Sequence, residues 1–269
     1  MKVSRLETTL NHAFLVVLDI LVLVPVVWFA LIAVSPNRAG LIRGVNLGNF
    51  AEAWVKADFA HTMAASAVIT VGSVVLQGVL SITAGYAFSV LGFPGQRAAF
   101  ALVLLGLMIS LEAILVPLYY QMRDLGLTDS WLGMILIHAG TGIPFGIFWM
   151  RAVFRDTSPA LIDAAHMDGA GSWRTLWRVL VPINAPAVLT LCLLNFMWTW
   201  NDYFLSLIFL ASPTKTTATV ALSNFQGVHA TSVNLLAAAA LTVSAPVVIL
   251  YLFFQRRFVA GIVSGGVKE

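Results

Sequence analysis

Charge is scarce in this chain. Only 10% of its 269 residues are Asp, Glu, Lys or Arg, whereas about a quarter of an ordinary soluble domain is charged. Apolar residues make up 59% of the chain, and the mean hydropathy is +0.91. A water-soluble domain does not need so much apolar surface, so the composition predicts a polytopic membrane protein. The net charge of +3 then gives no reason to expect nucleic acid as a partner.

Residues that build reactive centres are also sparse. Cys192 is the only cysteine, which excludes an intrachain disulfide and a cysteine-based zinc cluster. His138, His166 and His229 are scattered without metal-ligand spacing, so we predict neither a metal site nor a catalytic residue. The chain has no GxxxxGK[ST], the glycine-rich sequence that cradles nucleotide phosphates. We therefore expect no cofactor in this chain and no ATP binding by it alone.

Long apolar segments are what the chain has in abundance. A helix needs about 20 apolar residues to cross the roughly 30 Å hydrocarbon core of a bilayer. Six segments fit, at about 13–34, 62–90, 98–118, 131–150, 183–210 and 235–254. They predict an all-α polytopic membrane protein in which residues 1–269 form a single transmembrane domain with six helices.

The first segment also resembles a secretory signal, since Lys2 and Arg5 precede it and Ala33-Val34-Ser35 offers small residues for cleavage. Its apolar run is about 22 residues long, however, and the core of a signal peptide usually has about 7–15. We interpret it as a retained first span.

Small residues mark two of the spans. Those of the second span recur at helical spacing and permit close helix packing: Gly72, Ser73, Gly78, Ser81 and Gly85. Those of the fourth span predict a deformable middle: Gly140, Gly142, Pro144 and Gly146.

Basic residues predict the orientation. Six spans place both termini on one side, together with the loop at about 155–182. That side holds ten of the fifteen Lys and Arg residues: Lys2, Arg5, Arg97, Arg151, Arg155, Arg174, Arg178, Arg256, Arg257 and Lys268. The other side holds Arg38, Arg43, Lys56, Arg123 and Lys215. The positive-inside rule therefore predicts cytoplasmic termini and a cytoplasmic loop between the fourth and fifth spans.

That loop has the pattern of two short helices. Ser158-Pro159 is a helix start, and Gly169 can end the first helix in a left-handed conformation. A second helix is expected from Ser172. Trp173, Leu176, Trp177 and Leu180 share one face of it, with Arg174 and Arg178 on another. Physics alone allows two interpretations: a helix that contacts another protein, or one that lies on lipid headgroups.

A resemblance favours the first interpretation. Asp163-Ala164-Ala165, three residues, Gly169, nine residues and Val179-Leu180-Val181-Pro182 resemble the EAA loop of ABC importer permeases, and Asp168-Gly169-Ala170 matches its DGA. Asp163 stands where that family usually has Glu, and Val179 and Val181 replace Ile and Leu. Further matches are Phe93-Pro94-Gly95, Trp200-Asn201-Asp202-Tyr203, which is similar to WNEF, and the tail at 255–261 and 264–268. The chain most resembles the second permease subunit of maltose-type carbohydrate importers, with a type I ABC importer fold.

The resemblance implies a transport subunit rather than an enzyme. It would act in the cytoplasmic (inner) membrane of a bacterium and import a carbohydrate or polyol by alternating access. Implied partners are a second permease, two ATPase subunits that bind ATP and Mg, an extracytoplasmic sugar-binding protein and the lipid membrane. The family pairs unequal permeases, although the sequence would also permit a homodimer.

Three sets of residues are candidates for this function. The coupling set, implied by the resemblance to contact the ATPase, is Asp163, Ala164, Ala165, Met167, Asp168, Gly169 and Ala170. The tail set, for which the family implies the same partner, is Ser264, Gly265 and Gly266. The pathway set consists of polar and aromatic residues in a membrane span, which usually face protein or water: Asn195, Trp198, Asn201, Asp202 and Tyr203. Interfacial anchoring and helix bridging are the alternatives for the pathway set.

A rival function belongs to a different class. Glu112 and Asp202, with His138, could instead serve a stand-alone ion-coupled transporter or an integral membrane enzyme. Such a protein would work without an ATPase.

Overall fold

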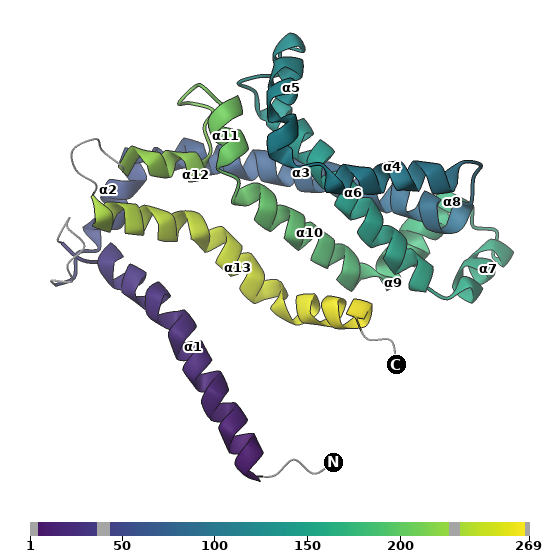
Figure 1. Ribbon diagram of the computed structural model, residues 1–269, viewed down its shortest axis with the longest axis horizontal. Coiled ribbons are helices and arrows are strands. Elements are labelled where there is room, and N and C mark those ends of the chain that lie inside the picture. Colours follow the sequence, from purple (N-terminus) through teal and green to yellow (C-terminus); the bar gives the residue numbers. More distant parts are fainter. Residues whose placement is uncertain (1–4, 37–43, 226–231, 267–269) are drawn as a thin grey trace. The chain divides into compact units, whose positions relative to one another are not determined.

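The computed structural model describes residues 5–36, 44–225 and 232–266, and within these ranges the chain forms helices and no strand. The helical segments are α1 (Arg5–Ala33), α2 (Gly48–Lys56), α3 (Phe59–Tyr86), η1 (Ala87–Leu91), α4 (Gln96–Met108), α5 (Leu111–Asp124), α6 (Trp131–Asp156), α7 (Pro159–Met167), α8 (Ser172–Thr175), η2 (Leu176–Leu180), α9 (Val181–Ile183), α10 (Ala185–Trp200), α11 (Phe204–Phe209), α12 (Ala218–Ala221), η3 (Leu222–Phe225) and α13 (Val233–Gly266) (Figure 1).

Four helices in the described residues are long and apolar enough to cross a membrane by themselves. They are Leu10–Ala33, Phe59–Leu91, Trp131–Asp156 and Val233–Gln255. Two bent pairs raise the number to six if each pair is one span: Gln96–Met108 with Leu111–Asp124, bent by 100°, and Ser172–Ile183 with Ala185–Trp200, bent by 83°.

The bends divide two segments that the sequence presents as continuous. The segment at 98–118 breaks because Ile109 and Ser110 both adopt extended backbone between α4 and α5. The Ser110 hydroxyl donates to the Glu112 carboxylate at the start of the new helix. The segment at 183–210 stops at Trp200, and α11 follows as a separate helix. Its start is stabilised by Asp202, whose carboxylate accepts from the backbone N–H groups of Leu205 and Ser206 at 3.3 and 3.0 Å.

The described chain falls into two compact units. The first comprises Met1–Ala60 and Ala221–Ala245. At its centre the buried Asn49 amide donates to the backbone oxygens of Ala33 and Ser35, both at 2.8 Å. Asn234 on α13 donates to the same Ser35 oxygen at 3.2 Å. These bonds tie the end of α1 to α2 and α13, so the segment between the first two predicted spans contains the helix α2.

The second unit comprises His61–Val220 and Pro246–Glu269, and it contains all the candidate residues of the coupling and pathway sets. Within it α3 packs closely against α6, and α4 lies beside α6 (Figure 1). A Cβ atom on Gly85 would lie 2.6 Å from Met150 Cβ, and one on Gly72 would lie 2.6 Å from Ile135 Cδ1. The small residues of α3 thus permit the close helix packing that the sequence predicts.

Two glycines of α6, Gly142 and Gly146, take part in the same contact with α3. The helix runs without a break from Trp131 to Asp156 and accommodates Pro144. A Cβ atom on Gly142 would meet the Gln77 amide, and one on Gly146 would overlap the Ser81 hydroxyl. Close approach to α3 therefore explains Gly142 and Gly146.

The loop before α6 is fastened to the segment after α11. Asp129, with a left-handed φ of 51°, donates its N–H to the Phe209 oxygen at 2.8 Å. Its carboxylate accepts from the Ser212 N–H at 2.9 Å, from the Ser212 hydroxyl at 2.5 Å and from Lys215 Nζ at 3.2 Å. The Ser212 hydroxyl, the Ser212 N–H and the Lys215 ammonium lower the pKa of Asp129 to about 2.

This fastening should make stability depend on acid. Because the pKa of Asp129 is depressed in the folded state, its carboxylate stabilises the fold above about pH 4, and the contribution is lost as the pH falls towards 2. We expect Asp129→Asn to lower the unfolding temperature of the detergent-solubilised protein at pH 6, with a difference from wild type that shrinks between pH 4 and 2. A difference that stays constant over this range would contradict the assignment.

Candidate functional site

The loop between α6 and α10 forms a turn of fixed geometry. Its first helix, α7, begins at Pro159, with Ser158 before it, and ends at Met167. Gly169 then adopts a φ of +76°, which residues with a Cβ atom avoid. The turn is closed by backbone bonds from Gly169 N–H to His166 O at 3.0 Å and from Ala170 N–H to Ala165 O at 2.9 Å. The left-handed glycine expected from the sequence is therefore present.

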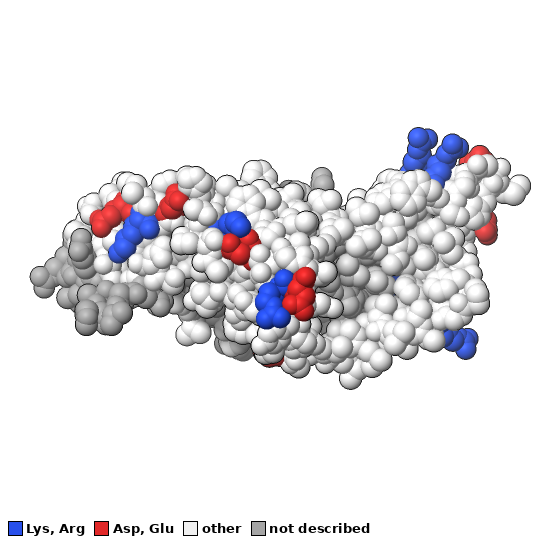
Figure 2. Space-filling view, turned by 90° about the horizontal axis from the view of Figure 1, so that it is seen from above, with Lys and Arg blue, Asp and Glu red and all other residues white. Residues whose placement is uncertain are grey.

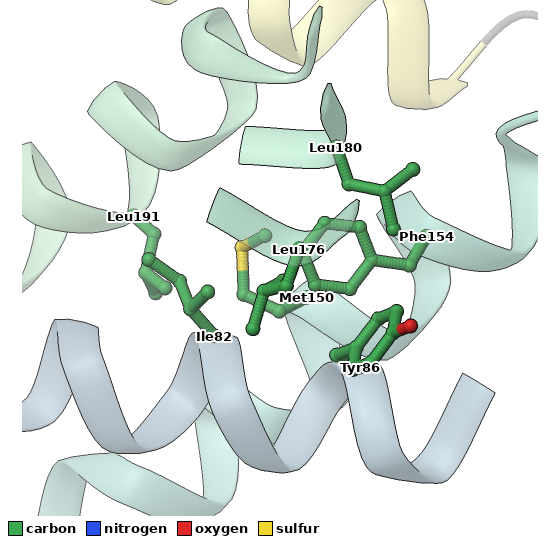
Figure 3. Packing of buried hydrophobic residues seen from close by; sticks show 7 residues of the cluster. All are labelled: Ile82, Tyr86, Met150, Phe154, Leu176, Leu180 and Leu191. Atoms are coloured by element: carbon green, nitrogen blue, oxygen red, sulfur yellow. The ribbon is translucent and has the colours of Figure 1, made fainter. Parts of the chain in front are cut away.

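The second part of the loop is anchored in the core. Leu176 and Leu180 of η2 pack in one cluster with Ile82 and Tyr86 of α3, Met150 and Phe154 of α6, and Leu191 of α10 (Figure 3). In this view Leu180 lies above the Phe154 ring, Leu176 lies beside it, and Tyr86 lies below it. Because Leu176 and Leu180 are at most 2% exposed, this segment cannot shift without displacing the cluster.

The apolar face expected on the second helix is only partly buried. Leu176 and Leu180 are buried and Trp177 packs against the cluster, but Trp173 remains 68% exposed. The Trp173 and Trp177 rings lie 5.6 Å apart. Arg174 and Arg178 are exposed, as expected for the polar face.

The coupling set divides by exposure. Ala165 is buried, and the other six residues are not: Asp163, Ala164, Met167, Asp168, Gly169 and Ala170. Met167 is 87% exposed. On the face drawn in Figure 2, charged side chains occur in small groups separated by uncharged surface. The end of α7 thus offers a short surface of small, apolar and acidic side chains on a rigid support.

A polar cavity lies between α3, α6 and α10. It encloses about 210 Å³ and is lined by Gln77, Leu111, His138, Thr141, Gly142, Phe145, Asn195, Trp198, Thr199, Asp202 and Leu205. Three members of the pathway set, Asn195, Trp198 and Asp202, meet at this cavity. Asn201 and Tyr203 do not line it, and the Asn201 amide donates to its own helix at Met197 O, 2.8 Å away.

The lining residues outside the pathway set include Gln77 and His138. Gln77 and His138 are 2% and 7% exposed, and each is a polar side chain inside a membrane-length apolar helix. That rarity was a usable signal, because polar groups in a span usually face protein or water. Only the tertiary structure reveals that both line the same cavity as Asn195.

Two other predicted groups are placed elsewhere. Glu112 lies in the first turn of α5 and does not line the cavity. The other two residues of the rival function do line it, and His138 Nε2 lies 3.8 Å from Asp202 Oδ2. The backbone of α13 continues through Ser264, Gly265 and Gly266, but the side chains of this tail set lie outside the described residues. Within the described residues no three His, Cys, Asp or Glu side chains could share a metal ion.

Comparison with known proteins gives consistent matches. Residues 77–263 match the family model described as binding-protein-dependent transport system inner membrane component. The chain is 34% identical over 263 residues to the trehalose transport system permease protein SugB of Mycobacterium tuberculosis, which covers 94% of this chain and 96% of that protein. It is 32% identical over 225 residues to the melibiose/raffinose/stachyose import permease protein MelC of Bacillus subtilis, with 83% and 82% covered.

Solved structures show the same architecture. A chain of a bacterial ABC transporter involved in the import of the acidic polysaccharide alginate superimposes with a TM-score of 0.83, at 23% identity, over 96% of this chain and 99% of that one. A chain of the alginate transporter in complex with its pentasaccharide-bound periplasmic protein gives a TM-score of 0.63 at 17% identity, with 94% and 98% covered.

Proposed function

The chain belongs to the family of inner membrane components of binding-protein-dependent transport systems, and we propose that it is the permease subunit of an ATP-driven importer for a carbohydrate or polyol. The observation that carries this proposal is the exposed end of α7, held on a rigid turn and anchored through η2 to three membrane helices. Relatives named for the transport of trehalose and of raffinose-type sugars support the substrate class.

The fold agrees with the expectation from the sequence. The chain is all-α, with six membrane spans when each bent pair counts as one, and it has the architecture of a type I ABC importer permease. The interpretation of this loop as a helix lying only on lipid has less support, because Leu176 and Leu180 are packed into the core.

Coupling follows from this mechanical arrangement. A cytoplasmic ATPase subunit would bind the exposed residues of α7 and the turn at Gly169. When two such subunits close on ATP, the docked loop is displaced, and η2 carries the displacement to α3, α6 and α10 through the Leu176 and Leu180 contacts. The membrane helices would then shift between outward-facing and inward-facing arrangements. A flexible loop could not transmit this displacement to the membrane helices.

The proposed assembly contains this chain, a second permease, two ATPase subunits and an extracytoplasmic sugar-binding protein. ATP and Mg would bind to the ATPase subunits, and this chain would carry no cofactor. Both termini and the α7 loop would be cytoplasmic, which the ten-to-five distribution of basic residues supports.

The stand-alone rival has less support. It would use Glu112, Asp202 and His138 together, but Glu112 does not line the cavity at which the other two meet. The Asp202 carboxylate is also engaged by three donors of α11, two N–H groups and the Ser206 hydroxyl at 3.0 Å. We therefore assign Asp202 a part in shaping the cavity wall.

Deletion of the gene tests the proposed function. Uptake of a panel of labelled neutral sugars and polyols should fall to background for at least one compound and return on complementation. Affinity purification of the tagged chain in mild detergent should recover an ATP-hydrolysing subunit. Unchanged uptake across the panel together with purification of the chain without ATPase activity would contradict the proposal.

A further inference from the structure

The polar cavity contains buried groups that the protein leaves unpaired. Gln77 Oε1, His138 Nε2 and both amide atoms of Asn195 have no hydrogen-bond partner among the described residues. The three side chains are 2%, 7% and 1% exposed. Buried polar groups without partners destabilise a fold and therefore require a specific explanation. All three lie at one cavity, which points to a shared ligand.

Neighbouring contacts hold the Gln77 amide in place. Gln77 Nε2 donates to the His138 backbone oxygen at 2.7 Å, and the Thr141 hydroxyl donates to the same oxygen at 3.1 Å. Gly142 leaves room for the Gln77 amide, because a Cβ atom there would lie 2.7 Å from the amide carbon. The unpaired Gln77 Oε1 is thus presented by an amide whose other atom is already bonded, so this part of the site is preorganised.

The chemistry of the lining selects an uncharged polyhydroxylated ligand. The unpaired groups include both donors and acceptors, and each hydroxyl group of a sugar can act as both. Trp198 is 53% exposed and stands edge-on to Phe145 with ring centroids 5.0 Å apart, which offers an aromatic wall to the C–H face of a sugar ring. An acidic ligand would bring its carboxylate towards Asp202, which also lines the cavity.

The size of the cavity limits what fits. Sites for drug-sized ligands commonly enclose about 300–1,000 Å³. This one encloses about 210 Å³, which suits one ring rather than an oligosaccharide. Resting on the proposed function, we propose that Gln77, His138 and Asn195 form a hydroxyl-binding subsite for one uncharged sugar or polyol ring, with Trp198 as its aromatic wall.

Asn195→Leu gives the sharpest test in the complete importer. Because neither amide atom of Asn195 has a protein partner, the variant should keep or raise the unfolding temperature of the complex. At the same time, uptake of the sugar identified by the deletion panel, measured below saturation, should fall about three- to tenfold, the effect of losing one or two hydrogen bonds to the ligand.

Thr190→Val is the matched control. Thr190 is also a buried polar residue of α10, but its hydroxyl donates to Pro186 O within the helix at 2.9 Å and does not line the cavity. Sugar uptake by the Thr190→Val variant should equal that of wild type. A second pair, Trp198→Ala and Trp198→Phe, changes an exposed side chain, and only the phenylalanine variant should retain uptake.

The outcomes separate the two proposals. If no compound of the panel depends on the gene, both proposals fail. If a sugar depends on it but Asn195→Leu and Trp198→Ala import that sugar at the wild-type rate, the subsite is wrong and the permease function stands. A loss of stability in Asn195→Leu without loss of uptake per folded complex would also overturn the subsite and assign Asn195 to helix packing.

Discussion

Valine in place of Gly169 should abolish coupled transport while the protein still folds. The turn after α7 requires a φ of +76°, which costs a residue with a Cβ atom about 1–2 kcal/mol and more when that carbon is branched. Space is not the difficulty, since a Cβ atom on Gly169 would meet nothing within 4 Å. We expect ATP-dependent uptake to fall at least about tenfold, because relaxation of the turn moves the exposed end of α7 away from the ATPase subunit.

Gly171 supplies the control for this change. It lies two residues further on, is also exposed and has open space around it, but its φ is −71°. Gly171→Val therefore adds the same side chain without backbone strain. Transport should be measured in proteoliposomes, together with the ATPase rate and the amount of assembled complex. An equal loss of uptake in both variants would mean that the bulk of the added side chain, rather than the conformation of the turn, causes the loss. Full uptake by Gly169→Val would count against the coupling role of the loop.

Alanine in place of Gly85 should separate α3 from α6. The added Cβ atom would lie 2.6 Å from Met150 Cβ and 3.0 Å from the Arg151 backbone nitrogen, and neither group can rotate away. Overpacking of this kind costs about 1–3 kcal/mol. Because Met150 belongs to the cluster that anchors η2, the damage should also reach the loop.

Gly78→Ala isolates the steric effect. It lies on the same helix seven residues earlier, and a Cβ atom there would approach only Cys192 Sγ, at an ordinary 3.9 Å. Alanine is a better helix former than glycine, so this variant should be neutral or slightly stabilising. Thermal unfolding of the two purified variants gives the difference directly. Similar unfolding temperatures would show that the two helices have room to separate.

Sequence reasoning succeeded where a local rule acts. Proline at the first position of α7 and glycine in the left-handed turn each depend on the conformational limits of a single residue. The apolar spacing of Leu176 and Leu180 identified the buried face of η2 because helical periodicity is local as well.

Sequence reasoning failed where a feature depends on two segments that are far apart in the chain. The breaks at Ile109 and after Trp200 lie inside segments whose average hydropathy predicts one span each. Trp173 has the same spacing as its buried neighbours and still remains exposed. The close contacts of Gly142 and Gly146 could not be predicted from the sequence, because their partners, Gln77 and Ser81, lie more than sixty residues away in the chain.

By itself the sequence determined that the chain lies in a membrane and that the loop after α6 contains a tight turn. Its apolar length requires a membrane, and its proline, glycine and leucine spacing sets the turn of the loop, because both depend on neighbouring residues. The tertiary structure alone decided the cavity. Gln77, His138 and Asn195 come from three different helices, and only their packing brings the unpaired polar atoms to one place.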